Sequence, residues 1–305
     1  MSVTTLSSPC RRPLGAHMSI AGGHCKAVER ALRVGADALQ VFTRNQVRWE
    51  SPPLNAEEAV RFCGLVKSSR IRFVCAHASY LINLASPDLE VFTKSRRALI
   101  EELRRAQALG CSGLVLHPGS GKGDDPMRAR HRLVDALGEA LDKTASLKVR
   151  LLLENTAGQG AVLGASIEEL GGLLADLQWP QRTGVCLDTA HLFAAGYDFR
   201  DHRKARGLLT AVRRCIGIEH IHVLHLNDSR HACGSRRDRH WHIGEGEIGR
   251  QGFANLLGFS EFGGIPGIIE TPKGDSADLD RDKQNLDTLR MVEGQADCHE
   301  HFDSQ

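Results

Sequence analysis

The chain has 305 residues, of which 41% are hydrophobic and 25% are charged, and its formal net charge is +2. This composition excludes disordered and collagen-like chains, and the small net charge excludes a protein that coats DNA as a polycation. No apolar run approaches the roughly 20 residues that a membrane span needs, so we expect no membrane partner.

The cysteines argue against a disulfide framework. There are 9 of them, scattered along the chain and never in Cys-x-x-Cys spacing. Disulfide scaffolds and cysteine zinc knuckles both need closer, paired spacing. We therefore expect free thiols in a reducing compartment.

Eight short apolar runs predict the strands of the fold. In chain order they cover residues 14–18, 38–43, 72–77, 113–117, 149–154, 183–188, 221–227 and 267–271. Their hydrophobicity is nearly continuous, which is typical of a parallel sheet covered on both faces. Eight such runs alternating with helical segments fit an α/β fold with a single-domain (β/α)8 barrel better than an open doubly wound sheet, which remains the structural alternative.

Helix signals lie between these runs. Ser86, Pro87 and Asp88 predict the start of a helix that Gly110 ends, and Ser166 with Glu169 forms a capping box. We expect the barrel domain to cover residues 13–292, between a disordered extension at 1–12 and a polar tail at 293–305.

Polar side chains end seven of the eight predicted strands. They are His17, His77, His117, Glu154, Asp188, His225 and Glu270. In a (β/α)8 barrel these strand ends converge on one face, where active sites form. His191 joins this set three residues after Asp188, and Asp238 with His240 adds a pair at two-residue spacing.

This set of side chains indicates a metal centre. Buried carboxylates repel one another and lose their hydration, and divalent cations resolve that conflict. Imidazole mixed with carboxylate, without thiolate, suits Zn²⁺, with Mn²⁺ or Fe²⁺ as lesser options.

From Gly15 to Glu270 the chain resembles the endonuclease IV family of apurinic/apyrimidinic endonucleases, on the xylose-isomerase-like barrel. The motifs that carry the resemblance are GAHMSIAGG, FTRNQVRW, HASYLINLA, LHPGS, LLLENTAGQG, GVCLDTAHLFAAGYD, HLNDS, GSRRDRHWHIGEGEIG and IIETP.

The resemblance implies three zinc ions per chain, with Mn²⁺ as a substitute. The first would take His77, His117 and Glu154; the second Glu154, Asp188, His225 and Glu270; the third His191, Asp238 and His240. Glu154 and Glu270 would be catalytic, Glu154 as a bridge between metals and Glu270 as an aid to proton handling.

The implied reaction is hydrolysis of the phosphodiester bond 5′ to an abasic site in double-stranded DNA, in base excision repair. It would leave a 3′-hydroxyl and a 5′-deoxyribose phosphate, and blocked 3′ ends would also be cleaned. The enzyme would be a hydrolase of the deoxyribonuclease IV (phage T4-induced) type. We expect a monomer, and the bacterial cytoplasm as its location, since the sequence shows no targeting signal.

An abasic nucleotide reaches a recessed metal site only by swinging out of the helix. The resemblance places Tyr80 and Leu81 on one DNA-facing loop, and Gln46 with Arg48 on another. Val47 departs from the family, because some relatives have an arginine there, and Trp241 stands where a polar residue is more usual. The best local basic patch is Arg230, His231, Arg236, Arg237 and Arg239.

Two other functions fit part of this pattern. Glu154, Asp188, His225 and Glu270 alone match the four-ligand site of a sugar isomerase or epimerase. That reaction needs none of the remaining candidate ligands, which are His77, His117, His191, Asp238 and His240. A noncatalytic barrel that binds metal or DNA predicts missing bridging ligands, and none is missing.

Overall fold

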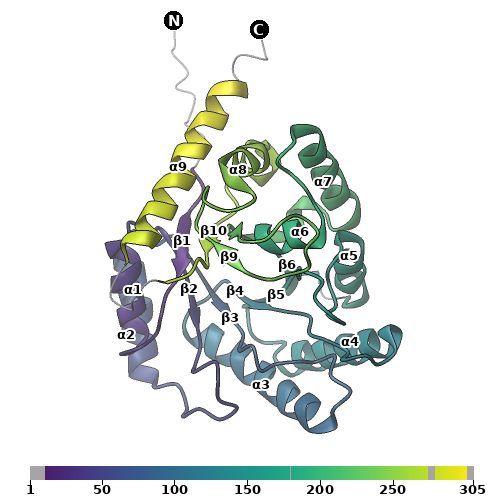
Figure 1. The fold of residues 1–305 in the computed structure, drawn as a ribbon. Coiled ribbons are helices and arrows are strands. Elements are labelled where there is room, and N and C mark those ends of the chain that lie inside the picture. The colour runs from purple at the N-terminus through teal and green to yellow at the C-terminus, as the bar shows by residue number, and fades with distance from the viewer. Residues whose placement is uncertain (1–10, 179, 274–278, 301–305) are drawn as a thin grey trace, which may run out of the picture.

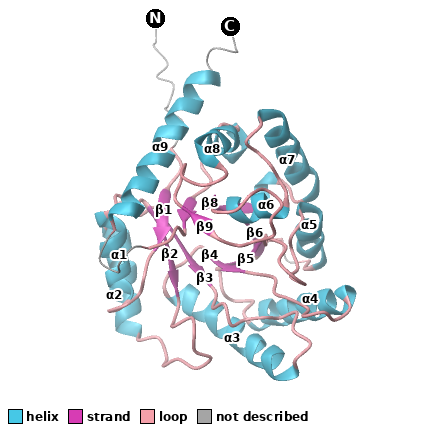
Figure 2. Cartoon of the chain, viewed as in Figure 1, coloured by secondary structure: helices cyan, strands magenta, loops and turns pink. Residues whose placement is uncertain are grey.

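Eight parallel strands close into a barrel with one helical layer outside it (Figures 1 and 2). The computed structural model describes residues 11–178, 180–273 and 279–300, the last six by their backbone alone. The barrel strands are β1 Leu14–His17, β2 Ala38–Phe42, β3 Phe73–His77, β4 Gly113–Leu116, β5 Arg150–Glu154, β6 Thr183–Asp188, β7 Ile221–His225 and β10 Gly267–Ile269. Each lies within a run that predicted it, so the barrel is confirmed over the open sheet.

The outer layer follows the β/α alternation. Its helices are α1 His24–Arg33, α2 Ala56–Ser68, α3 Leu89–Ala108, α4 Pro126–Lys143, α5 Ile167–Asp176, α6 Thr189–Ala195, α7 His202–Cys215, α8 Gly249–Leu257 and α9 Asp280–Glu300, with short 3₁₀ turns at Ile218–His220 and Ser260–Phe262. The predicted caps are present, since Asp88 accepts from Glu90 and Val91 and Ser166 accepts from Glu169. None of the described helices is both long and apolar enough to cross a membrane.

The barrel interior is filled by one layer of small and branched side chains. That layer is Ala38, Cys75, Val115, Leu152, Cys186, Val223 and Ile268. A larger apolar cluster fills the space between the strands and the helices. The strands meet closely at Gly15, where a Cβ atom would lie 1.7 Å from the carbonyl oxygen of Ala38.

A two-stranded hairpin that the sequence did not predict follows β7. It pairs β8 Asp228–Ser229 with β9 His240–Trp241 in antiparallel fashion. Asp228 is buried, and its carboxylate accepts five backbone N–H groups, from residues 229, 244, 246, 248 and 249. This single side chain therefore organises the loop after the hairpin.

The structure describes residues beyond both expected ends of the domain. Residues 1–10 lie outside the described part of the chain, but Arg12 is buried, pairs with Glu293 and donates to Ile265 O at 3.3 Å. Helix α9 continues to Glu300, so most of the expected tail is helical backbone. Helix α9 contacts β1 and β10, and Val292 is buried at the expected end of the domain.

Candidate metal centre

The polar residues of the site form a second layer directly above the apolar layer of the barrel. Side chains two residues apart on a strand point the same way. Each interior residue is therefore followed, two positions later, by a side chain that faces the same barrel axis. From β1 to β10 this polar layer is His17, Gln40, His77, His117, Glu154, Asp188, His225 and Glu270.

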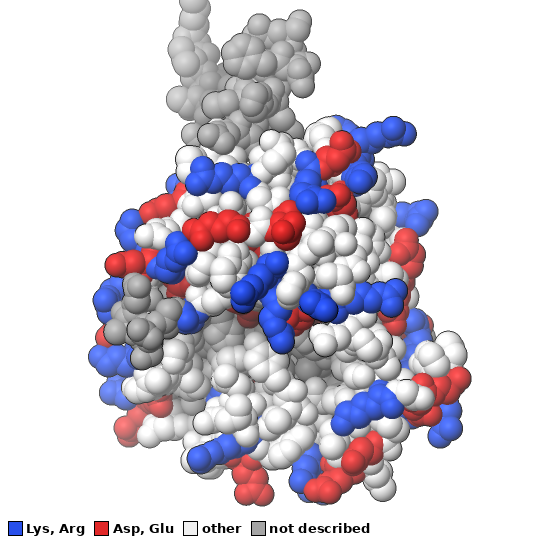
Figure 3. Space-filling model, viewed as in Figure 1, with Lys and Arg blue, Asp and Glu red and all other residues white. Residues whose placement is uncertain are grey.

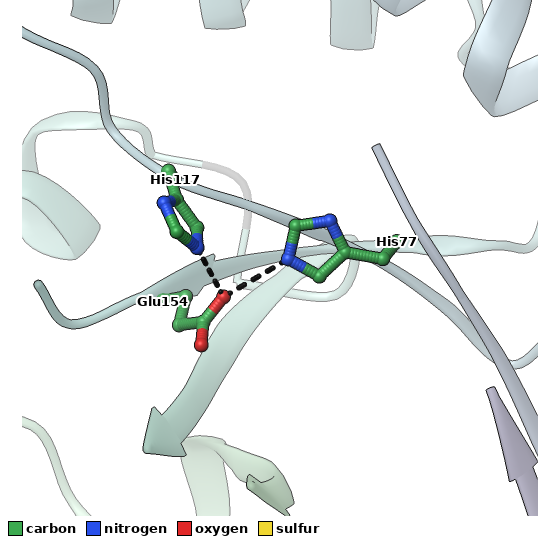
Figure 4. Close-up of side chains that lie close together, drawn as sticks. All are labelled: His77, His117 and Glu154. Carbon is green, nitrogen blue, oxygen red and sulfur yellow. Dashed lines mark hydrogen bonds and ion pairs between the residues drawn. The ribbon is translucent and has the colours of Figure 1, made fainter. Parts of the chain in front are cut away.

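The first cluster joins β3, β4 and β5. Oε2 of Glu154 lies 3.2 Å from His77 Nε2 and 2.9 Å from His117 Nε2. Figure 4 shows both rings directed at this one carboxylate oxygen. Glu154 and His77 are buried, while His117 keeps 32% of its side chain exposed at the mouth of the barrel. The three donor atoms lie within 4.8 Å of one another, which is close enough for one cation.

The second cluster centres on His225. Its Nδ1 lies 2.8 Å from Glu154 Oε1 and 3.2 Å from Glu270 Oε2. Asp188 Oδ2 is 3.9 Å from the same nitrogen. These four residues form the group expected for a second cation, and Glu154 belongs to both clusters.

The third cluster combines helix α6 with the hairpin. Donor atoms of Asp188, His191 and His240 lie within 4.8 Å of one another. Asp238 faces them, with Oδ1 at 3.3 Å from His191 Nε2 and 3.5 Å from His240 Nε2. Asp188 therefore faces two clusters, where the resemblance placed it in one.

Backbone carbonyls orient three of the imidazoles. The Nδ1 atoms of His77, His191 and His240 donate to the carbonyl oxygens of Ala78, Asn155 and Glu270 at 2.7, 2.9 and 3.2 Å. Because a carbonyl can only accept, each proton is on Nδ1 and each Nε2 lone pair points into the cavity. That is the tautomer a metal ligand needs.

The charged groups of the site shift one another's pKa values. Burial raises the pKa of Glu154, but His225 and His117 outweigh it and bring that pKa well below its usual range. Burial lowers the pKa of His191, but Asp188, Asp238 and Glu154 outweigh it and raise the pKa to about 10. In the absence of a metal, protons on the imidazoles therefore supply the positive charge that the carboxylates require.

The donor set fits divalent cations of the zinc type. Nε2 of His240 is buried and has no hydrogen-bond partner among the described residues, although two carboxylates face it at 3.5 Å. A cation between them would satisfy all three groups. Cys186 lies near Glu154 and His225, but it belongs to the apolar layer of the barrel, where burial raises its pKa to about 12.

The four residues expected at DNA lie on two loops beside this mouth. Tyr80 is 60% exposed, and its ring lies 5.3 Å from the His77 ring and 6.1 Å from the His117 ring. Leu81 and Gln46 are half-buried and Arg48 is exposed. Ser79 joins the loops by donating from Oγ to Gln46 O at 2.7 Å.

The basic patch lies on the loop that connects the two strands of the hairpin. Figure 3 shows Lys and Arg side chains beside the hollow in the middle of this face. The Arg230 guanidinium lies 4.8 Å from the centre of the Trp241 ring, so the unusual tryptophan serves as a platform for an arginine. Arg236, Arg237 and Arg239 are exposed, and His231 is half-buried.

Sequence reasoning missed two residues that contact the donors. Gln40 contacts three members of the polar layer, and its signal is a glutamine inside an apolar run, two positions after Ala38. Asn227 donates to Asp188 Oδ2 at 2.7 Å and accepts from the Glu270 N–H at 2.6 Å. His17 was found as a strand end, and the structure places its Nδ1 at 3.1 Å from Glu270 Oε1.

Comparisons with known proteins identify the fold and the family. The family described as xylose isomerase-like TIM barrel matches residues 28–293. A relative from Oleidesulfovibrio alaskensis named "Probable endonuclease 4" is 43% identical over 95% of this chain and 98% of its own length. The crystal structure of endonuclease IV from Thermus thermophilus is 36% identical, with a TM-score of 0.80 over 93% of this chain and 99% of that one. A D-tagatose 3-epimerase-like protein, with 19% identity, a TM-score of 0.68 and coverage of 93% and 99%, shares the fold alone.

Proposed function

The chain belongs to the endonuclease IV family of DNA-repair nucleases, and from that premise we propose that it is a zinc-dependent enzyme that cleaves DNA 5′ to abasic sites. The products would be a 3′-hydroxyl and a 5′-deoxyribose phosphate, and blocked 3′ ends would be cleaned by the same chemistry. The observation that carries this proposal is the convergence of three donor clusters that share Glu154 and Asp188.

Three cations would fill the three clusters. His77, His117 and Glu154 would hold the first, and Glu154, Asp188, His225 and Glu270 the second. Asp188, His191, Asp238 and His240 would hold the third. Bound zinc supplies charge neutralisation at the phosphate and lowers the pKa of a coordinated water toward about 7. Mn²⁺ is a substitute that the same donors accept.

The protein's own groups position the reacting parts. Glu154 presents one carboxylate oxygen to each of two clusters and so fixes their separation. Glu270 contacts His225 through Oε2 and His17 through Oε1, which places it to hold or move a proton at the barrel mouth. Both carboxylates stay ionised at neutral pH, because the adjacent imidazoles outweigh the effect of burial on their pKa values.

Selectivity for abasic sites would come from access to the recessed clusters. An abasic nucleotide lacks stacking and pairing, so it swings out at lower cost than a normal one. Tyr80 and Leu81 beside the mouth would support the distorted duplex, with Gln46 and Arg48 on the adjoining loop. The basic patch would contact phosphates of the flanking duplex. We propose that one chain does this as a monomer.

A sugar isomerase or epimerase is the second candidate. It requires the second cluster alone, and the D-tagatose 3-epimerase-like protein has the same fold. The first and third clusters, with four additional imidazoles, favour a phosphodiester substrate, because its several anionic oxygens need more than one cation.

Cleavage of a duplex with one tetrahydrofuran abasic analogue tests the proposal, with zinc analysis of the same sample before and after chelation. We expect incision 5′ to the analogue, its loss on chelation and its return with zinc. The same duplex without the analogue is the control substrate. If the zinc-loaded protein leaves the analogue intact and epimerises a ketose, the proposed function is wrong and the second candidate is correct.

A further inference from the structure

One member of the polar layer can be neither a zinc ligand of the usual kind nor part of the apolar core. Gln40 lies on β2, is completely buried and pairs in register with His17 on β1 and Cys75 on β3. We propose that Gln40 is a positioning residue that keeps the ring proton of His225 on Nε2 and holds the Glu270 carboxylate. This inference rests on the proposed function, because it concerns the second donor cluster.

The amide of Gln40 uses its complete hydrogen-bonding capacity. Its Oε1 accepts from His225 Nε2 at 2.9 Å and from the Cys75 thiol at 3.2 Å. Its Nε2 donates to Glu270 Oε1 at 2.6 Å and lies 3.0 Å from His17 Nδ1. Two donors and two acceptor positions are all that a primary amide offers, so every one is satisfied.

The surroundings allow only this orientation of the amide. If the oxygen and nitrogen exchanged places, the oxygen would face the Glu270 carboxylate oxygen, and both would accept. The nitrogen would then face the Cys75 thiol, and the thiol proton would lose its acceptor. Both changes leave buried groups without a partner, which costs about 1–3 kcal/mol for each group.

A fixed amide oxygen selects one nitrogen of His225. Because Gln40 Oε1 accepts from Nε2, the proton of a neutral ring is on Nε2 and the lone pair is on Nδ1. That Nδ1 is the atom that faces Glu154, Asp188 and Glu270. The side chain thus does for His225 what backbone carbonyls do for His77, His191 and His240.

The same amide orders the two residues on its other side. One N–H holds Glu270 Oε1, so that Oε2 is left to face His225. The second N–H lies beside His17 Nδ1 at 3.0 Å, an atom that is also 3.1 Å from Glu270 Oε1. The other ring nitrogen of His17, Nε2, is buried and has no partner among the described residues.

The test measures the ring of His225 and the affinity for zinc. In the zinc-loaded protein with ring-labelled histidine, nuclear magnetic resonance should find the His225 proton on Nε2, in slow exchange with water. Gln40→Met keeps the volume but removes both acceptor and donors, so this resonance should broaden or disappear. Competition with a chromophoric chelator should then show affinity for one zinc reduced about 10- to 100-fold. Gln107→Met is the matched control, because the Gln107 side chain accepts from the backbone N–H groups of Lys148 and Val149, near the start of β5, and from no other described residue.

A second variant separates the two roles of the amide. Gln40→Glu keeps an acceptor for His225 and should retain the slow Nε2 proton, while it loses the donors to Glu270 and His17. A wild-type protein with the His225 proton on Nδ1 would overturn the proposal without any variant, as would a Gln40→Met protein with normal resonance and zinc affinity. A wild-type protein that binds no zinc would instead reject the proposed function.

Discussion

The carboxylate of Asp188 lies 3.5 Å from His240 Nε2, although β6 and the hairpin belong to different parts of the chain. Its Oδ2 atom also faces His225 at 3.9 Å, so one side chain serves the second and the third donor cluster. This shared position makes the two clusters depend on each other.

Asp188→Asn should therefore remove more zinc than His240→Asn. The aspartate variant weakens two clusters, whereas the histidine variant weakens only the third. Zinc analysis after gel filtration would measure both, with circular dichroism as the check on folding. Equal losses of one zinc in the two variants would contradict a shared role for Asp188.

Glu154→Gln should reduce cleavage of abasic DNA by well over 100-fold, because loss of a residue that only orients a metal ligand already costs up to roughly 100-fold. The amide keeps the shape but cannot present an anionic oxygen to each of two clusters. Initial rates with verified zinc content are the measurement. Glu261→Gln, at an ion pair with Arg213 on the surface, is the control and should cleave normally. Near-normal turnover by a zinc-containing Glu154→Gln protein would refute the bridging role.

Zinc affinity should rise with pH. The pKa of His191 is raised to about 10 in the metal-free protein, so the ring carries a proton at neutral pH and zinc must displace it. The ring keeps this proton at any pH below its raised pKa. The affinity for zinc should therefore increase about tenfold per pH unit for each proton displaced, from pH 6 to about 9. Calorimetry in two buffers of different ionisation enthalpy would count the released protons. An affinity that does not change over this range would contradict the prediction.

Tyr80→Ala should weaken binding to abasic DNA by about 1–3 kcal/mol, the range for a lost aromatic contact with a base. The exposed ring lies beside the mouth, whereas its inner edge contacts Phe42 and His77. Fluorescence anisotropy with the tetrahydrofuran duplex would measure the change. Tyr80→Phe keeps the ring and should bind normally. If the alanine variant loses zinc as well, the ring supports the metal centre and not the DNA.

Arg237→Gln should reduce the salt dependence of DNA binding by about one phosphate contact. This side chain is exposed on the basic patch and forms no ion pair with another described residue. The slope of log affinity against log salt concentration gives the number of contacts. Arg203→Gln, exposed on the outer helix α7, should leave the slope unchanged. A slope that does not respond to Arg237→Gln would remove this arginine from the DNA surface.

Much of the fold was predictable because local sequence patterns specify the strands and helices of the barrel. Continuous apolar runs mark the strands, and caps such as Asp88 mark the helices between them. The hairpin β8–β9 was not predictable, because its strands have two residues each. Its position depends on Asp228, whose five backbone partners come together only in the folded chain.

The sequence by itself determined which residue types stand at the ends of the strands, since the two-residue period repeats along every strand and places His77 or Glu154 two positions after an interior residue. Only the tertiary structure decided how these side chains divide into clusters, because distances such as Asp188 to His240 arise from chain segments far apart in sequence. The role of Gln40 was decided in the same way. A glutamine in an apolar run has no local partner, and its four hydrogen bonds exist only because the closed barrel brings β1, β3, β7 and β10 around it.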